Sequence, residues 1–298
     1  MKTCSKFYYG LAVVAITIMM ASAPIFAADM DNKEDYSMKG GYSILGSKFI
    51  GLDIENPQGD NIGKVKDIML DSIGRINYVA VSYGGFMGMG DKMYTVPTDA
   101  FTFKRNSDSF YDDIKLVLNI NKEELEADKG FDTDNWPNLD DEGYRKDLDK
   151  RYYIDRSNMN DTHKMYKKYN STMKGGYSVL GSKFLGLEIK NPQGDNIGQV
   201  KDIILDSTGL VRYVAVSYGG FMGMGEKMYT VPMDAFTFTR DSDSFFDDVK
   251  LSLNISKEQL KDHKGFDTKN WPDLDDKAYR KELDKRYNIN RDGSNMIN

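Results

Sequence analysis

Short runs of alternating apolar and polar residues, rich in β-branched and aromatic side chains, fill the segment between Lys48 and Leu118. The runs that predict strands are Lys48–Ile54, Ile62–Leu70, Ile76–Tyr83, Lys92–Val96, Phe101–Phe103 and Ile114–Leu118. Asn56–Asn61 (NPQGDN) and Asp71–Gly74 are typical of turns, because Pro fixes φ while Gly and Asp tolerate unusual backbone angles. Five or six short strands separated by turns predict a small antiparallel sheet that closes on itself as a β-barrel.

After these strands the spacing of apolar residues changes from the alternation of a strand to the period of a helix. Asn121 followed by Glu124 is typical of a capping box, which begins a short helix. Further on, Tyr144, Leu148 and Tyr152 recur at a spacing of four and predict one face of a second helix. Between the two helices lies Trp136, which we expect to pack the helical tail onto the barrel.

The whole pattern is written twice. MKGGYS begins at Met38 and at Met173, and every later motif recurs at the same offset of 135 residues. Two units of ordinary domain size predict two similar domains, each with a core of its own. The predicted organisation is a first repeat at 38–152 (barrel about 41–105, helical tail about 121–152), a linker at 153–172, a second repeat at 173–287 and a polar tail at 288–298.

The N-terminal segment has the pattern of a secretory signal. Lys2 and Lys6 precede an apolar run, Leu11–Met20, and small residues follow before the acidic stretch begins. We predict a signal peptide at 1–27 with cleavage after Ala27, which places the chain in the periplasm or otherwise outside the cytoplasm. Cleavage after Ala28 and an uncleaved anchor are the alternatives, and only the anchor gives a membrane association.

Composition removes several function classes. The formal net charge of −6 disfavours a nucleic-acid binder, which needs a basic surface. The one Cys, Cys4, excludes an intrachain disulfide. Of the two His, His163 lies in the predicted linker, while His263 corresponds to Asp128 in the first repeat, so the repeats share no histidine for catalysis. We predict a protein that is not an enzyme, with no cofactor.

Several motifs, spaced in the same order in both repeats, resemble the PRC-barrel family, named for the photosynthetic reaction-centre H subunit. They are Gly46 with Ile50-Gly51, Gly59–Gly63 (GDNIG), Val65–Asp67 (VKD), Tyr78–Ser82, GGFMGMG and Tyr94–Pro97 (YTVP), and the second repeat has the same set from Gly181 to Pro232. The resemblance implies two tandem small β-barrels, each followed by short helices, in a mainly β chain with an α tail. It also implies an assembly or adaptor module, without a catalytic residue set.

The most unusual motif is GGFMGMG, in which glycines free the backbone and Met side chains repack easily against varied partners. Its residues are Gly84, Gly85, Phe86, Met87, Gly88, Met89 and Gly90, and in the second repeat Gly219, Gly220, Phe221, Met222, Gly223, Met224 and Gly225. We predict that these residues bind a protein partner or a second copy of the chain. The alternative is that they plug one end of each barrel; the spacing does not match a phosphate-binding GxGxxG loop.

Acidic clusters offer a weaker candidate. Asp140-Asp141-Glu142, Asp275-Asp276, Asp112-Asp113 and Asp247-Asp248 carry oxygen ligands of the kind that Ca²⁺ binds. None has the spacing of a calcium loop, and acids at a helix N-terminus explain the first cluster without a metal. We therefore predict no metal site. Our main hypothesis is a non-enzymatic adaptor of an envelope complex; the alternative is an envelope protein that binds a small ligand or ion at the barrel mouth or acidic tail.

Overall fold

In the computed structural model, the described residues all belong to one unit, Tyr36–Asn298. The structure describes residues 43–71, 73–83, 92–105, 114–127, 129–133, 135–139, 141–156, 178–206, 208–218, 227–240, 249–262, 264–274 and 276–289. The predicted signal peptide and most of the predicted linker lie outside these ranges. Among the helices within them, none is both long and apolar enough to cross a membrane.

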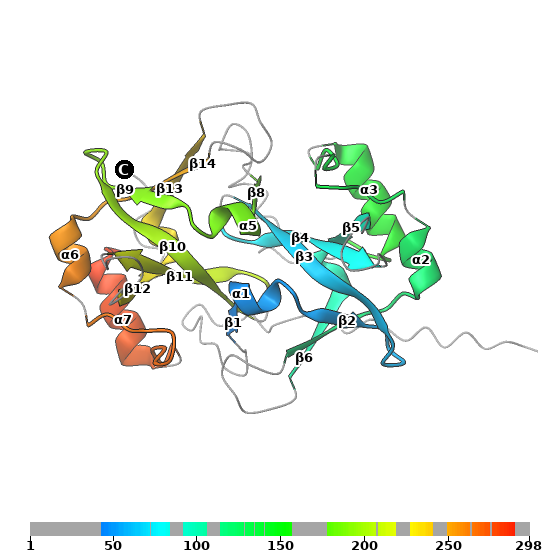
Figure 1. The fold of residues 1–298 in the computed structure, drawn as a ribbon, viewed down its shortest axis with the longest axis horizontal. Helices are drawn as coiled ribbons and strands as arrows, with labels where there is room; N and C mark the ends of the chain where they lie inside the picture. Colours follow the sequence, from blue (N-terminus) through cyan, green and yellow to red (C-terminus); the bar gives the residue numbers. More distant parts are fainter. Residues whose placement is uncertain are drawn as a thin grey trace, which may run out of the picture. The chain divides into compact units, whose positions relative to one another are not determined.

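Each repeat folds into the same succession of short elements (Figure 1). The first repeat forms β1 (Ile44–Leu45), α1 (Gly46–Phe49), β2 (Asp53–Glu55), β3 (Asn61–Asp71), β4 (Ile76–Tyr83), β5 (Lys92–Pro97), η1 (Thr98–Ala100), β6 (Phe101–Arg105), β7 (Ile114–Leu118), α2 (Lys122–Glu126) and α3 (Glu142–Arg151). The second forms β8 (Ser178–Leu180), α5 (Gly181–Phe184), β9 (Glu188–Lys190), β10 (Asn196–Leu205), β11 (Val211–Tyr218), β12 (Lys227–Pro232), η2 (Met233–Ala235), β13 (Phe236–Arg240), β14 (Val249–Leu253), α6 (Lys257–Lys261) and α7 (Lys277–Arg286).

The strands build two curled, half-barrel sheets of the same topology. The first has the order β5-β4-β3-β2-β7-β6 and the second β12-β11-β10-β9-β14-β13. Pairing is antiparallel except between β2 and β7 and between β9 and β14, which run parallel. Register shifts along β3, between Val65 and Asp67 and between Met69 and Leu70, are β-bulges that bend and twist the strand. The predicted fold class, mainly β with short helices after each sheet, is confirmed.

One predicted strand is wrong at its start. Lys48–Ile54 reads as a single apolar run, but its beginning belongs to the short helix α1 and only its end to β2. Gly51, at φ 101°, separates the two, and its N–H bonds to the carbonyl of Val65 on β3 (2.8 Å). A left-handed residue of this kind suits glycine because it has no Cβ. The chain therefore enters its own sheet only after Gly51.

Before that point, each repeat contributes its first strand to the sheet of the other. β1 pairs with β10 in the register Ile44↔Leu205 and Leu45↔Ile204. β8 pairs in turn with β3, with Leu180 opposite Met69 and Val179 opposite Leu70. In Figure 1 the blue β1 and α1 accompany the yellow-green β10, while β8 and α5 accompany the cyan β3. We call this reciprocal arrangement the strand exchange.

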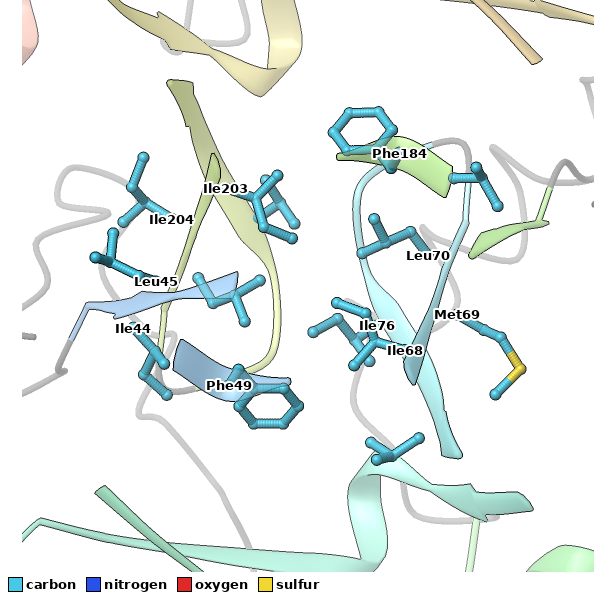
Figure 2. Packing of buried hydrophobic residues seen from close by; sticks show 14 of the residues in the cluster. Ile44, Leu45, Phe49, Ile68, Met69, Leu70, Ile76, Phe184, Ile203 and Ile204 are labelled. Carbon is cyan, nitrogen blue, oxygen red and sulfur yellow. The ribbon is translucent and has the colours of Figure 1, made fainter. Parts of the chain in front are cut away.

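The strand exchange corrects the expectation that each repeat has a separate core. The buried apolar residues of both repeats form one continuous cluster. Figure 2 shows Ile44 and Leu45 beside Ile203 and Ile204 of the other repeat. Phe184 lies on β3 of the first repeat in the same way. Each sheet is thus completed by apolar side chains from its neighbour, so the two repeats bury their surfaces together.

A further contact joins the β3–β4 turn of one repeat to the β10–β11 turn of the other. Arg75 and Leu210 face each other in an isolated antiparallel bridge. The bonds on either side run from the N–H of Ile76 to the carbonyl of Gly209 (2.9 Å) and from the N–H of Val211 to the carbonyl of Gly74 (2.8 Å). The bridge is therefore of the type whose facing residues lie closest together, with Cα atoms about 4.5 Å apart.

The helical tail is anchored to the sheet as expected. Both capping boxes are present, and in the first Asn121 accepts from the N–H of Glu124 (2.8 Å). Phe131 exchanges two backbone hydrogen bonds with Met93 on β5 (2.9 and 2.8 Å). The ring of Trp136 lies 4.7 Å from that of Phe131. Phe131 thus joins the tail to β5, while Trp136 packs against Phe131 and against the buried core, in line with its predicted structural role.

Tyr153, the second residue after α3, can be tested against its counterpart in the second repeat. Tyr153 has φ 56° and its side chain is 80% exposed, whereas its counterpart Asn288 has φ 53°. Asn occupies the left-handed region more readily than Tyr. We expect Tyr153→Asn to raise the free energy of unfolding by about 0.5–1 kcal/mol, because the left-handed backbone of a non-glycine residue costs about 1–2 kcal/mol. Urea denaturation measures it, and Asn288→Tyr should have the opposite effect.

Candidate functional site: the paired hairpins and the contact between repeats

The two GGFMGMG motifs connect equivalent strands. β4 and β5 form a hairpin whose last pair is Tyr83↔Lys92, and β11 and β12 end in the same way at Tyr218↔Lys227. Gly84–Gly90 and Gly219–Gly225 themselves lie outside the described residues. The structure therefore fixes the strands from which both candidate loops leave, and these are the same strands in both repeats.

Each of these hairpins is held from two sides. The strand β4 runs through the core, where Val79, Ala80 and Val81 are fully buried. At the loop end of the hairpin, Gly130 of the helical tail has φ 63° and lies so close to Lys92 that a Cβ would stand 3.1 Å from the Lys92 Cβ. The corresponding Gly265 is as close to Lys227 (2.9 Å). The helical tail therefore braces both hairpin ends.

The sequence analysis missed a pair of buried carboxylates where the repeats meet. Asp202, on β10, is 6% exposed and accepts hydrogen bonds from the backbone N–H (2.9 Å) and the hydroxyl (2.5 Å) of Ser47, which belongs to the other repeat. Asp67 on β3 accepts the same two hydrogen bonds from Ser182, the backbone one at 3.0 Å. Burial raises the pKa of Asp202, although the hydrogen bonds from Ser47 oppose the shift. These carboxylates hold the strand exchange together.

Two glycines let the segments approach so closely. A Cβ on Gly46 would stand 2.3 Å from Cγ1 of Ile203, and a Cβ on Gly181 would stand 2.4 Å from Cγ1 of Ile68. Such distances are far below a van der Waals contact. Gly-Ser in α1 and α5, facing Asp-Ile in β10 and β3, is therefore one recognition unit that occurs twice.

The other titratable groups of the core serve the fold. Burial raises the pKa of Asp71, whose carboxylate accepts from the backbone N–H groups of Arg75 and Ile73 and so closes its own turn. Burial also raises the pKa of Tyr78 to about 12, so its hydroxyl stays protonated at neutral pH.

The predicted acidic clusters are only partly described. Asp141 caps α3 by accepting from the N–H of Tyr144 (2.9 Å), and Asp276 caps α7 by accepting from the N–H of Ala278 (2.8 Å), so helix capping accounts for both. Glu142 pairs with Lys146 (2.7 Å). The other acidic residues of these clusters lie outside the described ranges, as do both histidines; they are Asp112, Asp113, Asp140, Asp247, Asp248, Asp275, His163 and His263. Across the described residues, no three His, Cys, Asp or Glu gather to hold a metal ion.

Comparison with known proteins agrees with this architecture. A family model for the PRC-barrel domain matches residues 43–122 and 178–250, which together are more than half of the chain. The two matched regions begin at β1 and β8, the strands that the repeats exchange. No curated protein matches the chain.

Proposed function

The chain belongs to the PRC-barrel domain family, and from this premise we propose that it is a non-enzymatic, exported interaction protein that supports assembly of a bacterial envelope complex. Its two GGFMGMG loops are the partner-binding residues in this proposal. Export rests on the N-terminal pattern of Lys2, Lys6 and the apolar run Leu11–Met20.

One observation supports the proposal above the rest: the same braced hairpin is presented twice by one interlocked unit. The hairpins end at Tyr83↔Lys92 and Tyr218↔Lys227, and the strand exchange ties their sheets together. Two equal contacts on one body bind a partner with two matching sites more tightly than either alone, because the second contact forms at high effective concentration. The strand exchange strengthens this argument, since the spacing of the loops no longer depends on the linker alone.

The proposal predicts a steep loss of binding when one loop is changed. We expect Met87→Ser with Met89→Ser to reduce the apparent affinity for the partner by about 10²-fold or more, since bivalent binding gains about 10²–10⁴-fold over a single contact. Adding Met222→Ser and Met224→Ser should abolish binding. Crosslinking in the native envelope recovers the partner, and titration of the purified partner measures the affinity.

The matched control replaces the same four methionines by leucine. Leucine keeps apolar bulk at each position, so binding should persist if the loops form an apolar contact. Circular dichroism and thermal unfolding confirm that each variant is folded. Unchanged affinity in the folded serine variants would remove the loops from the proposal, and stabilisation by Ca²⁺, a quinone or a lipid would favour the ligand-binding alternative.

A further inference from the structure

The strand exchange uses the same residues in both repeats. We call the first strand and helix of a repeat (β1 with α1, β8 with α5) the donor, and the strand of the other repeat that they pair with (β10, β3) the acceptor. Each donor carries Leu-Gly-Ser-Lys-Phe, at 45–49 and at 180–184, and each acceptor carries Val-Lys-Asp-Ile, at 65–68 and at 200–203. The backbone hydrogen bonds from serine to aspartate agree within 0.1 Å, at 2.9 Å for Ser47 and 3.0 Å for Ser182. A donor therefore finds a complete acceptor in any chain of this sequence.

The connection between donor and own sheet is short and local. Phe49 at the end of α1 stacks on Phe103 of its own repeat (6.0 Å), and Gly51 already bonds to Val65 of its own sheet. The donor thus extends outward from its sheet by only a few residues. Whether the acceptor belongs to the same chain or to another does not alter this path.

The contacts at the turns differ between like and unlike pairs of repeats. Gly74 lies against Met233 of the other repeat, where a Cβ would stand 2.9 Å from the Met side chain. Gly209 lies instead against Thr98, with 3.1 Å to its Cγ2. Met233 and Thr98 are counterparts and both are buried. Two first repeats facing each other would have Thr at both of these contacts and two second repeats would have Met at both, so only a first repeat facing a second repeat reproduces the contacts of the structure.

We propose that the chain binds a second copy of itself by making the strand exchange between chains, the first repeat of each with the second repeat of the other. Such a closed pair contains every contact described above, and it differs from the single chain only in which chain supplies each donor. Pairing within one chain benefits from an effective concentration of about 1 mM. The two-chain form therefore accumulates when chains fold together at high concentration, and it is retained on dilution because reversal requires both donors to leave buried sites.

The facing residues of the turn bridge allow a direct test in the full chain. Two versions are prepared with Cys4→Ser, which removes the one native thiol: the first carries Arg75→Cys and one affinity tag, the second Leu210→Cys and a different tag. Cysteines at facing positions of a close antiparallel pair suit a disulfide. Since each chain has a single thiol, any disulfide between position 75 and position 210 joins two chains.

The two versions are unfolded, mixed near 1 mM (about the effective concentration of the tethered repeats), refolded and oxidised. We expect a disulfide-linked species with both tags, exceeding the homodimers of either version alone by about tenfold, because only a first repeat facing a second repeat brings positions 75 and 210 together. Mixing the two after separate refolding at low concentration should give little of it. Light scattering after size-exclusion chromatography should show the same dimer for the chain with neither substitution.

Two outcomes overturn the proposal. Equal yields of the mixed and the homotypic species would mean random thiol collision or pairing of like repeats. The absence of the mixed species, while a single chain carrying both substitutions forms its internal disulfide, would mean that the strand exchange stays within one chain. That doubly substituted chain also shows that neither substitution prevents folding.

Discussion

Replacing both Gly46 and Gly181 by alanine is expected to destabilise the protein strongly. Each new Cβ would meet an isoleucine side chain at 2.3 or 2.4 Å, and both isoleucines, Ile203 and Ile68, are fully buried. Overpacking a core site costs about 1–3 kcal/mol. The double variant should therefore lose about 2–6 kcal/mol of unfolding free energy, which for a protein of this size lowers Tm by roughly 5–20 °C. Calorimetry measures it.

The chain provides a matched control for this experiment. Gly143 lies in α3, and its counterpart in the second repeat is Ala278 in α7. Gly143→Ala adds the same methyl group where the nearest atom is the end of a side chain, Oδ1 of Asp141 at 3.0 Å. Alanine is the better helix former by about 1 kcal/mol, so this variant should be neutral or slightly stabilised. If Gly46→Ala and Gly181→Ala behave like Gly143→Ala, the close approach of the repeats is wrong.

Removing the carboxylate of Asp202 is the second change with a large expected effect. Asp202→Ala leaves the N–H and hydroxyl of Ser47 and the N–H of Ile203 without their acceptor. An unsatisfied buried donor costs about 1–3 kcal/mol, so we expect a loss of about 2–4 kcal/mol in urea denaturation. Asp67→Ala should cost a similar amount because Ser182 depends on it in the same way. A loss below about 0.5 kcal/mol, usual for surface substitutions, would contradict the buried contact.

Asp202→Asn separates the charge of this residue from its hydrogen bonds. Burial raises the pKa of Asp202 above the ordinary 3.8, so the folded protein takes up this proton before the unfolded chain does. As the pH falls from neutral toward that value, the wild type gains stability from this group, whereas asparagine cannot titrate. The unfolding free energy of the wild type minus that of Asp202→Asn should therefore grow on acidification. A difference that shrinks would reverse the assigned direction.

The strands were predictable because a half-buried strand carries its own signal in the alternation of side chains. Ile76–Tyr83 was predicted to the residue, and Lys92–Val96 and Ile62–Leu70 nearly so. The helix α1 was not, because four residues are too few for a helical period to emerge. The parallel pairing of β2 with β7 could not be predicted either, because the alternation of apolar and polar residues along a strand does not indicate which strand lies beside it.

The strand exchange could not be predicted because the two repeats are nearly identical. β1 would fit β3 and β10 equally well by local pattern, as the acceptors share Asp-Ile at 67–68 and 202–203. One signal did exist. Asp67 follows the exposed Lys66 and precedes three buried apolar residues, 68–70, and a bulge after Val65 places it in the core. A buried carboxylate requires hydrogen-bond partners, and in the part of the repeat that the structure describes the N–H of Ile68 is the partner from its own strand.

Because both halves belong to one polypeptide, the two sides of their contact can carry different residues, which identical subunits cannot. In an assembly of two equal chains, every substitution appears on both sides of the twofold axis. Here Asp71 is bonded by Asn77, whereas the equivalent Asp206 pairs with Arg212, and Met233 stands where the first half has Thr98. A substitution in one half therefore changes one face of the contact and leaves the equivalent face intact, which a pair of identical subunits does not allow.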